Sequence, residues 1–187
     1  MNNFELTNQV VILTGAAGGL GRAFALAFGE AGARVVCADI NEDGIKETAR
    51  LITEQGNQAI ALAVNVTDPT STEQMVQRVV AQWEQVDVLV NNAAIYAGLV
   101  RRPFWEIDPD EWDRVLDVNV KGVWLSSKAV IPSMLERGGR IINIASATFY
   151  SGSPGWLHYV ASKGSIIGMT RAMARELGNS TITVTHW

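Results

Sequence analysis

The stretch Thr14-Gly-Ala-Ala-Gly-Gly-Leu-Gly21 follows an apolar run at residues 10–13 and precedes a segment rich in apolar residues at 22–31. The run is typical of a buried strand, and the later segment has the apolar density of a helix packed on a sheet. The glycines therefore lie in a strand-to-helix turn, where a ligand can approach the backbone. The free N–H groups of a helix start favour a pyrophosphate there. A glycine-rich turn without a ligand is the alternative, because a short glycine pattern is weak evidence.

The next apolar run, residues 34–39, follows a predicted helix stop at Gly32 and ends in the carboxylate of Asp39. In dinucleotide-binding units an acidic residue lies about 20 positions beyond the glycine turn. There it accepts hydrogen bonds from the hydroxyls of the adenosine ribose. A turn residue or helix cap is the alternative for Asp39, but the glycine turn before it favours the dinucleotide site.

Length and composition indicate one globular domain spanning residues 1–187. The chain is 48% hydrophobic and 18% charged, which argues against disorder. A net charge of −4 without a basic run argues against nucleic-acid binding. Cys37 is the single cysteine and lies in an apolar run, so neither an internal disulfide nor a cysteine metal site is expected. The two histidines of the chain do not suggest a metal site either.

The sequence predicts a cytoplasmic protein. Glu5 and the lack of a basic leader argue against a secretory signal. The longest uncharged stretch, residues 141–162, is interrupted by Asn143, Gly152 and Pro154. A membrane span needs about 20 predominantly apolar residues, so none is expected here.

Strand and helix patterns alternate along the rest of the chain. Further helices are predicted at residues 44–55, 70–85, 108–137 and 159–177, and further strands at 59–64, 86–90, 140–145 and from 181 onward. Thr70 and Glu73 predict a capping box at the start of the second of these helices. Asp108 is expected to cap the third, and Pro132 to kink it.

Strands that alternate with helices form a parallel sheet with helices on both faces. Right-handed crossovers then predict a doubly wound α/β fold of the Rossmann type, with about six strands in the order 3-2-1-4-5-6. Ligands in such sheets bind outside the carboxyl ends of the strands. Gly15, Asp39, Asn91 and Ser146 all fall at that edge, so they are expected to form one site.

Tyr159 and Lys163 lie four positions apart on a predicted helix, so their side chains share one face. A tyrosine titrates near pH 10, at about the value of a free phenol. A neighbouring ammonium group, together with the positive charge of a nicotinamide ring, favours the phenolate and brings the hydroxyl nearer to a useful acid–base range. Ser146, after the fifth strand, can donate a hydrogen bond to a carbonyl oxygen. An ordinary amphipathic helix is the alternative, because Tyr-x-x-x-Lys often occurs by chance.

In order and spacing, these motifs resemble the short-chain dehydrogenase/reductase family over nearly the whole chain from Val10. The matching motifs are Thr14–Gly21, Asn91-Asn-Ala-Ala94, Asn119, Ser146 and Tyr159-Val-Ala-Ser-Lys163. The resemblance implies an oxidoreductase that transfers a hydride between NAD(H) and a small-molecule carbonyl or secondary-alcohol substrate.

The resemblance also implies roles for single residues. Tyr159 would be the general acid or base, and Lys163 would bind the nicotinamide ribose and lower the pKa of the tyrosine. Ser146 would polarise the carbonyl, and Asn119 would hold a water molecule in a proton relay. Asn91 would be a structural and cofactor contact. The residues expected to bind the cofactor are Gly15, Gly19, Leu20, Gly21, Asp39, Ile40, Asn65, Val66, Asn92, Ala93, Tyr159 and Lys163.

The expected cofactor is NAD. Family members that prefer NADP usually place a basic residue just before the second glycine or just after the second strand. Gly18 and Ile40 occupy those positions here, and Asp39 would repel a 2′-phosphate.

A homodimer or homotetramer is also expected. In the family, the helices that correspond to residues 108–137 and 159–177 pack against their copies in a partner subunit. Apolar residues on these two helices exceed what one sheet face needs. They are Trp112, Val115, Leu116, Val123, Trp124, Ile166, Ile167 and Met169.

The chain departs from the family pattern at Ala94, where glycine is usual, at Asn65, where aspartate is common, and in its length. Members usually continue past the sixth strand with a Pro-Gly segment, a substrate-covering helix and a seventh strand, which these 187 residues lack. The alternative function is therefore a catalytically impaired dinucleotide-binding or interaction protein left by C-terminal truncation.

The remaining histidines and aromatic residues have weaker assignments. His158 is expected to line the substrate site at most, and His186 to be incidental. Packing in the core or at an interface is the first expectation for the aromatic residues of the two loops beside the site, and an apolar substrate wall is the second. These residues are Tyr96, Phe104, Trp105, Phe149, Tyr150 and Trp156.

Overall fold

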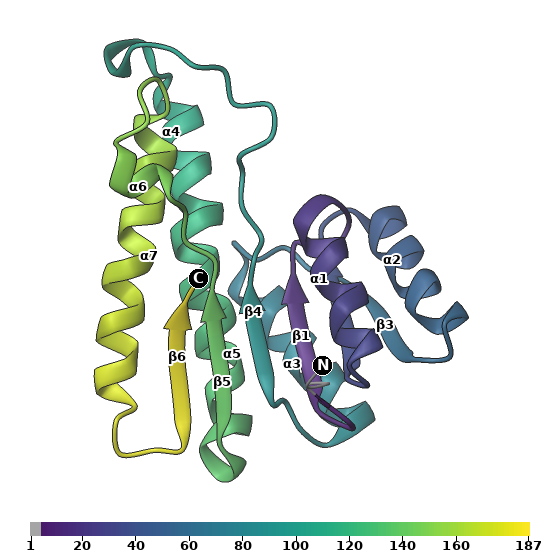
Figure 1. The fold of residues 1–187 in the computed structure, drawn as a ribbon. Helices are drawn as coiled ribbons and strands as arrows, with labels where there is room; N and C mark the ends of the chain where they lie inside the picture. The colour runs from purple at the N-terminus through teal and green to yellow at the C-terminus, as the bar shows by residue number, and fades with distance from the viewer. Residues whose placement is uncertain (1–4) are drawn as a thin grey trace.

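Six parallel strands form one sheet in the order β3-β2-β1-β4-β5-β6, which confirms the predicted topology. The computed structural model describes residues 5–187; residues 1–4, part of the segment in which no secretory signal is expected, lie outside the described residues. In Figure 1 the arrows of β1, β4, β5 and β6 all point to the top of the view. The strands are β1 (Val10–Thr14), β2 (Arg34–Asp39), β3 (Gln58–Ala63), β4 (Val88–Asn91), β5 (Gly139–Asn143) and β6 (Ile182–His186).

Helices cover both faces of the sheet, as predicted (Figure 1). On one face, Ala25 and Ile52 pack in one apolar cluster with strand residues such as Leu13. On the other face, Met75 and Met134 pack in a second cluster. The helical elements are α1 (Gly19–Glu30), α2 (Glu42–Glu54), α3 (Pro69–Trp83), the 3₁₀ turn η1 (Phe104–Glu106), α4 (Pro109–Leu116), the π-helical η2 (Asp117–Lys121), α5 (Gly122–Arg137), α6 (Thr148–Ser151) and α7 (Leu157–Glu176).

Several helices begin earlier than predicted. α1 begins at Gly19, so the later glycines of the turn belong to its first helical turn. The cap of α2 is Asn41, whose Oδ1 accepts a hydrogen bond from the Gly44 N–H at 3.0 Å. The predicted capping box at Thr70 is wrong, because Asp68 caps α3 and Pro69 occupies its first turn. An Asp cap followed by proline starts a helix more strongly than a threonine one turn later.

The single helix predicted at residues 108–137 is divided by the π-helical segment η2. Asp108 does cap it, since its carboxylate accepts hydrogen bonds from the two following helical N–H groups. α5 runs through Pro132 to Arg137, so the helix continues past this residue as predicted, and the kink expected there stays a prediction. A π turn accommodates an extra residue and often lies beside a functional site. Here it contains Asn119.

Within residues 5–187, no helix is long and apolar enough to cross a membrane. The carboxyl ends of the strands and the loops after them lie at the top of Figure 1, and the candidate site is formed there.

Candidate active site

A cavity of about 1140 Å³ lies at the carboxyl ends of the strands and contains nearly all of the predicted site residues. It extends from the glycine turn after β1 to the start of α7, past the loops that follow β2, β3, β4 and β5. The predicted residues that line it are Gly15, Gly19, Leu20, Gly21, Asp39, Ile40, Asn65, Val66, Asn92, Ala93, Ser146, Tyr159 and Lys163.

The glycine turn has a backbone geometry that other residues cannot adopt without strain. Gly15 has φ +71°, and a Cβ there would lie 2.8 Å from both the Asn92 Nδ2 and the Ala93 Cα. A Cβ at Gly21 would overlap the Gly15 carbonyl oxygen, so the start of α1 packs directly on the turn. The Asn92 side chain donates to the carbonyl oxygens of Thr14 and Gly15, each at 3.1 Å. The loop after β4 therefore fixes the turn from behind.

The side of the turn that faces the cavity is open. Among the described residues, apart from the chain neighbours and the nearby backbone of α1, no atom lies within 4 Å of a Cβ placed on Gly18 or Gly19. Both residues line the cavity at the N-terminus of α1, where unpaired N–H groups favour an anion. The residues present thus fit the pyrophosphate of a dinucleotide.

Asp39 ends β2 at the rim of the cavity and is held there by backbone donors. Its Oδ2 accepts a hydrogen bond from the Ala17 N–H at 3.2 Å, and its Oδ1 accepts one from the Asn41 N–H at 3.0 Å. Each oxygen retains a lone pair for a further donor. A ribose diol is such a donor, which fits the adenosine half of a dinucleotide.

Ser146, Tyr159 and Lys163 line the opposite part of the same cavity. The Ser146 Oγ accepts hydrogen bonds from the Thr148 N–H at 3.2 Å and the Thr148 hydroxyl at 2.9 Å. Thr148 therefore leaves the proton of Ser146 available for the Tyr159 oxygen or for a bound carbonyl oxygen. Thr148 was not predicted from the sequence, although its position two residues after Ser146 is a signal that could have indicated a short hydroxyl turn.

Lys163 is nearly buried, with its ammonium group donating to the Ile144 carbonyl oxygen at 2.7 Å. The Lys163 Nζ lies 5.7 Å from the centre of the Tyr159 ring. Burial lowers the pKa of Lys163 to about 8. The pKa of Tyr159 is raised, mainly by burial, with a hydrogen bond from Ser146 opposing the shift and the nearby Tyr96 adding to it. Burial therefore outweighs the hydrogen bond from Ser146 at Tyr159, and the lowered tyrosine pKa that the resemblance implies beside a bound nicotinamide stays a prediction.

Asn119 lies behind the cavity, 1% exposed. Its Oδ1 accepts from the Ile95 N–H at 2.7 Å, and its Nδ2 donates to the Ile95 carbonyl oxygen at 3.2 Å and the Ser162 Oγ at 3.1 Å. These bonds join η2 to the loop after β4 and to α7. In the structure the side chain thus positions two walls of the cavity, while the water-holding role stays a prediction.

Two other predicted contacts lie away from the cavity. Asn91 is buried inside the fold, and its Nδ2 donates to the Ser127 Oγ and the Asn143 Oδ1. His158 is fully buried and lies 3.1 Å from a carboxylate oxygen of Glu111, so it fastens α7 to α4 and does not line the substrate site. Neighbouring helical residues point in different directions, which places His158 away from the cavity that Tyr159 faces.

The aromatic residues of the two loops have different positions. Tyr96 lines the cavity, and its ring centre lies 5.0 Å from that of Tyr159 and 5.4 Å from that of Trp156. Phe104 and Trp105 line a separate groove and are exposed, as is Tyr150. These three exposed residues therefore do not pack in the core of the single chain, and their packing at an interface stays a prediction. Of the aromatic residues considered for an apolar substrate wall, Tyr96 lines the cavity.

Known proteins resemble this chain over almost its whole length. The family model for short chain dehydrogenases matches residues 9–186. The 3-oxoacyl-(acyl-carrier-protein) reductase of Thermotoga maritima is 37% identical over 96% of this chain and 72% of its own length. The enzyme of that name from Staphylococcus epidermidis is 39% identical, over 95% of this chain and 72% of its own.

A solved structure agrees with these relatives. The 3-ketoacyl-(acyl-carrier-protein) reductase of Brucella melitensis, crystallised with NADH, is 32% identical and superimposes with a TM-score of 0.91. The match covers 97% of this chain and 75% of that one. These relatives are named as enzymes, which gives no support to the alternative of a non-catalytic protein. With its glycine turn, its strand order and its Ser-Tyr-Lys group in one cavity, the chain belongs to the short-chain dehydrogenase family of oxidoreductases.

Proposed function

We propose that the protein is an NAD-dependent oxidoreductase that interconverts a carbonyl compound and the corresponding secondary alcohol. The observation that carries this proposal is the single cavity shared by the glycine turn, Asp39 and the Ser146–Tyr159–Lys163 group. The relatives named as ketoacyl and oxoacyl reductases support a carbonyl substrate. The cofactor supplies the hydride when it is bound.

The protein's own groups position the substrate and move a proton. Ser146 can donate its proton to the carbonyl oxygen in place of the Tyr159 oxygen, because both Thr148 groups act as donors to its Oγ. In the reducing direction Tyr159 gives its phenolic proton to the same oxygen and becomes a phenolate. Lys163, with a pKa of about 8, is mostly charged at neutral pH. Its ammonium group therefore stabilises the phenolate as it forms.

The experiment compares NADH-dependent reduction of a panel of ketones by the parent chain, Tyr159→Phe and Tyr150→Phe. Tyr159→Phe should lower the rate by about 10²-fold or more, because the positioned proton donor is lost. Tyr150 is 73% exposed and lies outside the cavity lining, so Tyr150→Phe is the matched control and should keep the parent rate. Equal rates in the parent and Tyr159→Phe would refute the proposed mechanism.

The proposed preference for NAD(H) follows from Asp39. Its carboxylate is fixed by two backbone N–H groups beside the exposed Ile40, where the 2′-phosphate of NADP(H) would approach. A repelled or lost ribose contact corresponds to about tenfold or more in affinity. Fluorescence titration should therefore give a lower Kd for NADH than for NADPH, and Asp39→Ser should narrow the gap. NADPH binding as tight as NADH binding to the parent would contradict the preference.

A further inference from the structure

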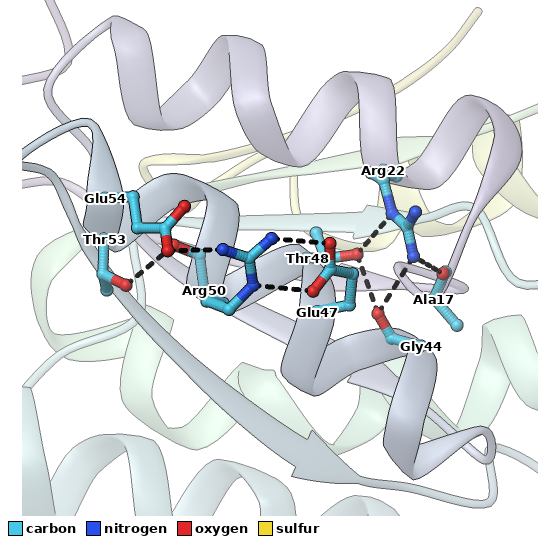
Figure 2. Close-up of polar contacts among 8 residues, drawn as sticks. All are labelled: Ala17, Arg22, Gly44, Glu47, Thr48, Arg50, Thr53 and Glu54. Atoms are coloured by element: carbon cyan, nitrogen blue, oxygen red, sulfur yellow. Dashed lines mark hydrogen bonds and ion pairs between the residues drawn. The ribbon is translucent and has the colours of Figure 1, made fainter.

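Arg22 lies in the first turns of α1, and its guanidinium group bridges the glycine turn and α2 (Figure 2). Its Nη2 donates to the Ala17 carbonyl oxygen at 2.6 Å and to the Gly44 carbonyl oxygen at 3.3 Å. Its Nε donates to the Thr48 Oγ1 at 2.9 Å. One side chain thus connects a carbonyl of the turn with two points on the neighbouring helix.

Thr48 continues this connection into the interior. The residue is fully buried, and its hydroxyl lies 2.8 Å from the Ala16 carbonyl oxygen and 3.0 Å from the Gly44 carbonyl oxygen. The packing leaves no slack, because a Cβ on Gly44 would lie 2.6 Å from that of Ala17. The turn, Arg22 and the start of α2 therefore form one closely fitted unit.

The same unit holds Asp39. Ala17 is fixed on both sides, since its carbonyl oxygen accepts from Arg22 and its N–H donates to the Asp39 Oδ2 at 3.2 Å. Loss of the guanidinium fork would free the Ala17 carbonyl, and with it the N–H that orients the carboxylate. The position of the Asp39 carboxylate at the cavity rim thus depends on Arg22, although Arg22 itself does not line the cavity.

The acceptors of Arg22 are carbonyl and hydroxyl oxygens, and no carboxylate of the described residues lies within ion-pair distance of it. The guanidinium is partly buried, and its Nε and Nη2 are committed to the protein. A bidentate contact between these two nitrogens and a phosphate would require breaking their hydrogen bonds to the turn and to α2. A cation beside a dinucleotide site could bind a phosphate, but the hydrogen bonds of Arg22 indicate that it stabilises the glycine turn.

We propose that Arg22 is a positioning residue that sets the ribose end of the cofactor site and thereby maintains the preference for NADH over NADPH. The inference rests on the proposed function. The Asp39 carboxylate selects NADH, the Ala17 N–H orients this carboxylate, and Arg22 holds Ala17 in place through its carbonyl oxygen. A lysine retains the charge but lacks the planar fork that reaches the three acceptors, so charge alone does not replace Arg22.

The test measures the Kd of NADH and of NADPH by fluorescence titration, with the thermal unfolding temperature of each variant. The variants are Arg22→Met, Arg22→Lys and Thr48→Val, the last of which keeps the cation and removes one acceptor. Arg50→Met is the matched control. Arg50 also carries a guanidinium group on α2, but it pairs with Glu47 and Glu54 on the exposed side of this helix (Figure 2).

Arg22→Met and Arg22→Lys should each weaken NADH binding by about tenfold, with a smaller loss for NADPH. The Kd of NADPH divided by the Kd of NADH should therefore fall severalfold. Thr48→Val should shift the ratio in the same direction by less, and Arg50→Met should match the parent in Kd values and ratio. A variant that unfolds early but is titrated well below its unfolding temperature still reports the ratio.

Three results in the Arg22 variants would overturn the inference. An equal loss for both dinucleotides would show that Arg22 only supports the fold, and a larger loss for NADPH would show that it binds the extra phosphate. Unchanged Kd values in the Arg22 variants would overturn the inference while leaving the proposed function intact. Failure of the parent chain to bind either dinucleotide would refute the proposed function, and this inference with it.

Discussion

Lys163 is a charged side chain in a nearly buried position, which is costly for the folded protein. Its pKa falls from an ordinary value of 10.5 to about 8 on folding. Between these two pH values the unfolded chain binds more protons than the folded chain, so stability rises with pH across this window. Below about pH 8 both states are protonated and the full penalty is present.

Lys163→Met should therefore stabilise the protein at pH 7 by about 2 kcal/mol, once the lost hydrogen bond to Ile144 is subtracted. The advantage should shrink as the pH rises from 8 toward 10.5, as followed by urea unfolding at several pH values. The exposed Lys128→Met is the control and should show no such pH dependence. A Lys163→Met variant that is less stable than the parent at pH 7 would contradict the burial penalty.

Among single residues, those whose chemistry requires a certain type at a certain spacing were predictable. The glycine turn, Asp39 and the Tyr159–Lys163 pair belong to this group, and the structure places them in one cavity. Arg22 and Thr148 were not predictable, because their hydrogen bonds go mainly to nearby backbone or hydroxyl groups, contacts that leave no spacing pattern. The burial that raises the pKa of Tyr159 was not predictable either, since burial depends on the whole fold.

The helical elements η2 and α7 and the loop after β4 meet at Asn119. Asn119→Ala should lower the free energy of unfolding by about 1–3 kcal/mol, because the Ile95 backbone groups and the Ser162 hydroxyl lose partners in a buried place. Urea denaturation measures the change. Asp117→Ala is the control in the same π segment, since its ion pair with Lys121 is exposed, and it should change the stability little. Equal stabilities of the two variants would rule out the joining role of Asn119.

Strong periodicity made the strands and long helices predictable, whereas their details were not. The π segment η2 follows α4 without any change in composition that breaks a helical pattern. The short elements η1 and α6 span too few residues for a period to be recognised. α3 begins before the predicted start at Thr70, because two capping signals compete there and Asp68 followed by Pro69 forms the cap.

We predict that the whole molecule forms at least a dimer, although the apolar residues of its two long helices support this only in part. Of the apolar residues assigned to a partner contact, four are buried within the single chain: Val115, Val123, Ile166 and Ile167. Trp124 is 51% exposed and Leu135 is 57% exposed on α5, so an apolar surface remains. Light scattering at micromolar concentration should give at least twice the monomer mass, and Trp124→Lys should reduce it. A clean monomer for the parent chain would refute the dimer.

The strand order was predictable for the molecule as a whole, because alternating elements and right-handed crossovers leave few arrangements. The substrate was not, because the cavity wall near Tyr159 consists of loop residues such as Tyr96 and Ala147, which follow no period. The relatives narrow the reaction to the family's oxidoreductase chemistry.

The most direct measurement is isotope transfer from NADH that carries deuterium at the reactive carbon of its nicotinamide ring. The parent chain and Tyr159→Phe are incubated with this cofactor and a ketone, and the alcohol is analysed by mass spectrometry. With the parent chain we expect alcohol that carries deuterium on the former carbonyl carbon. Tyr159→Phe should form far less of this labelled alcohol in the same time. Alcohol without deuterium would contradict hydride transfer from the cofactor. Equal amounts of labelled alcohol formed by the two proteins in the same time would contradict the assistance of Tyr159.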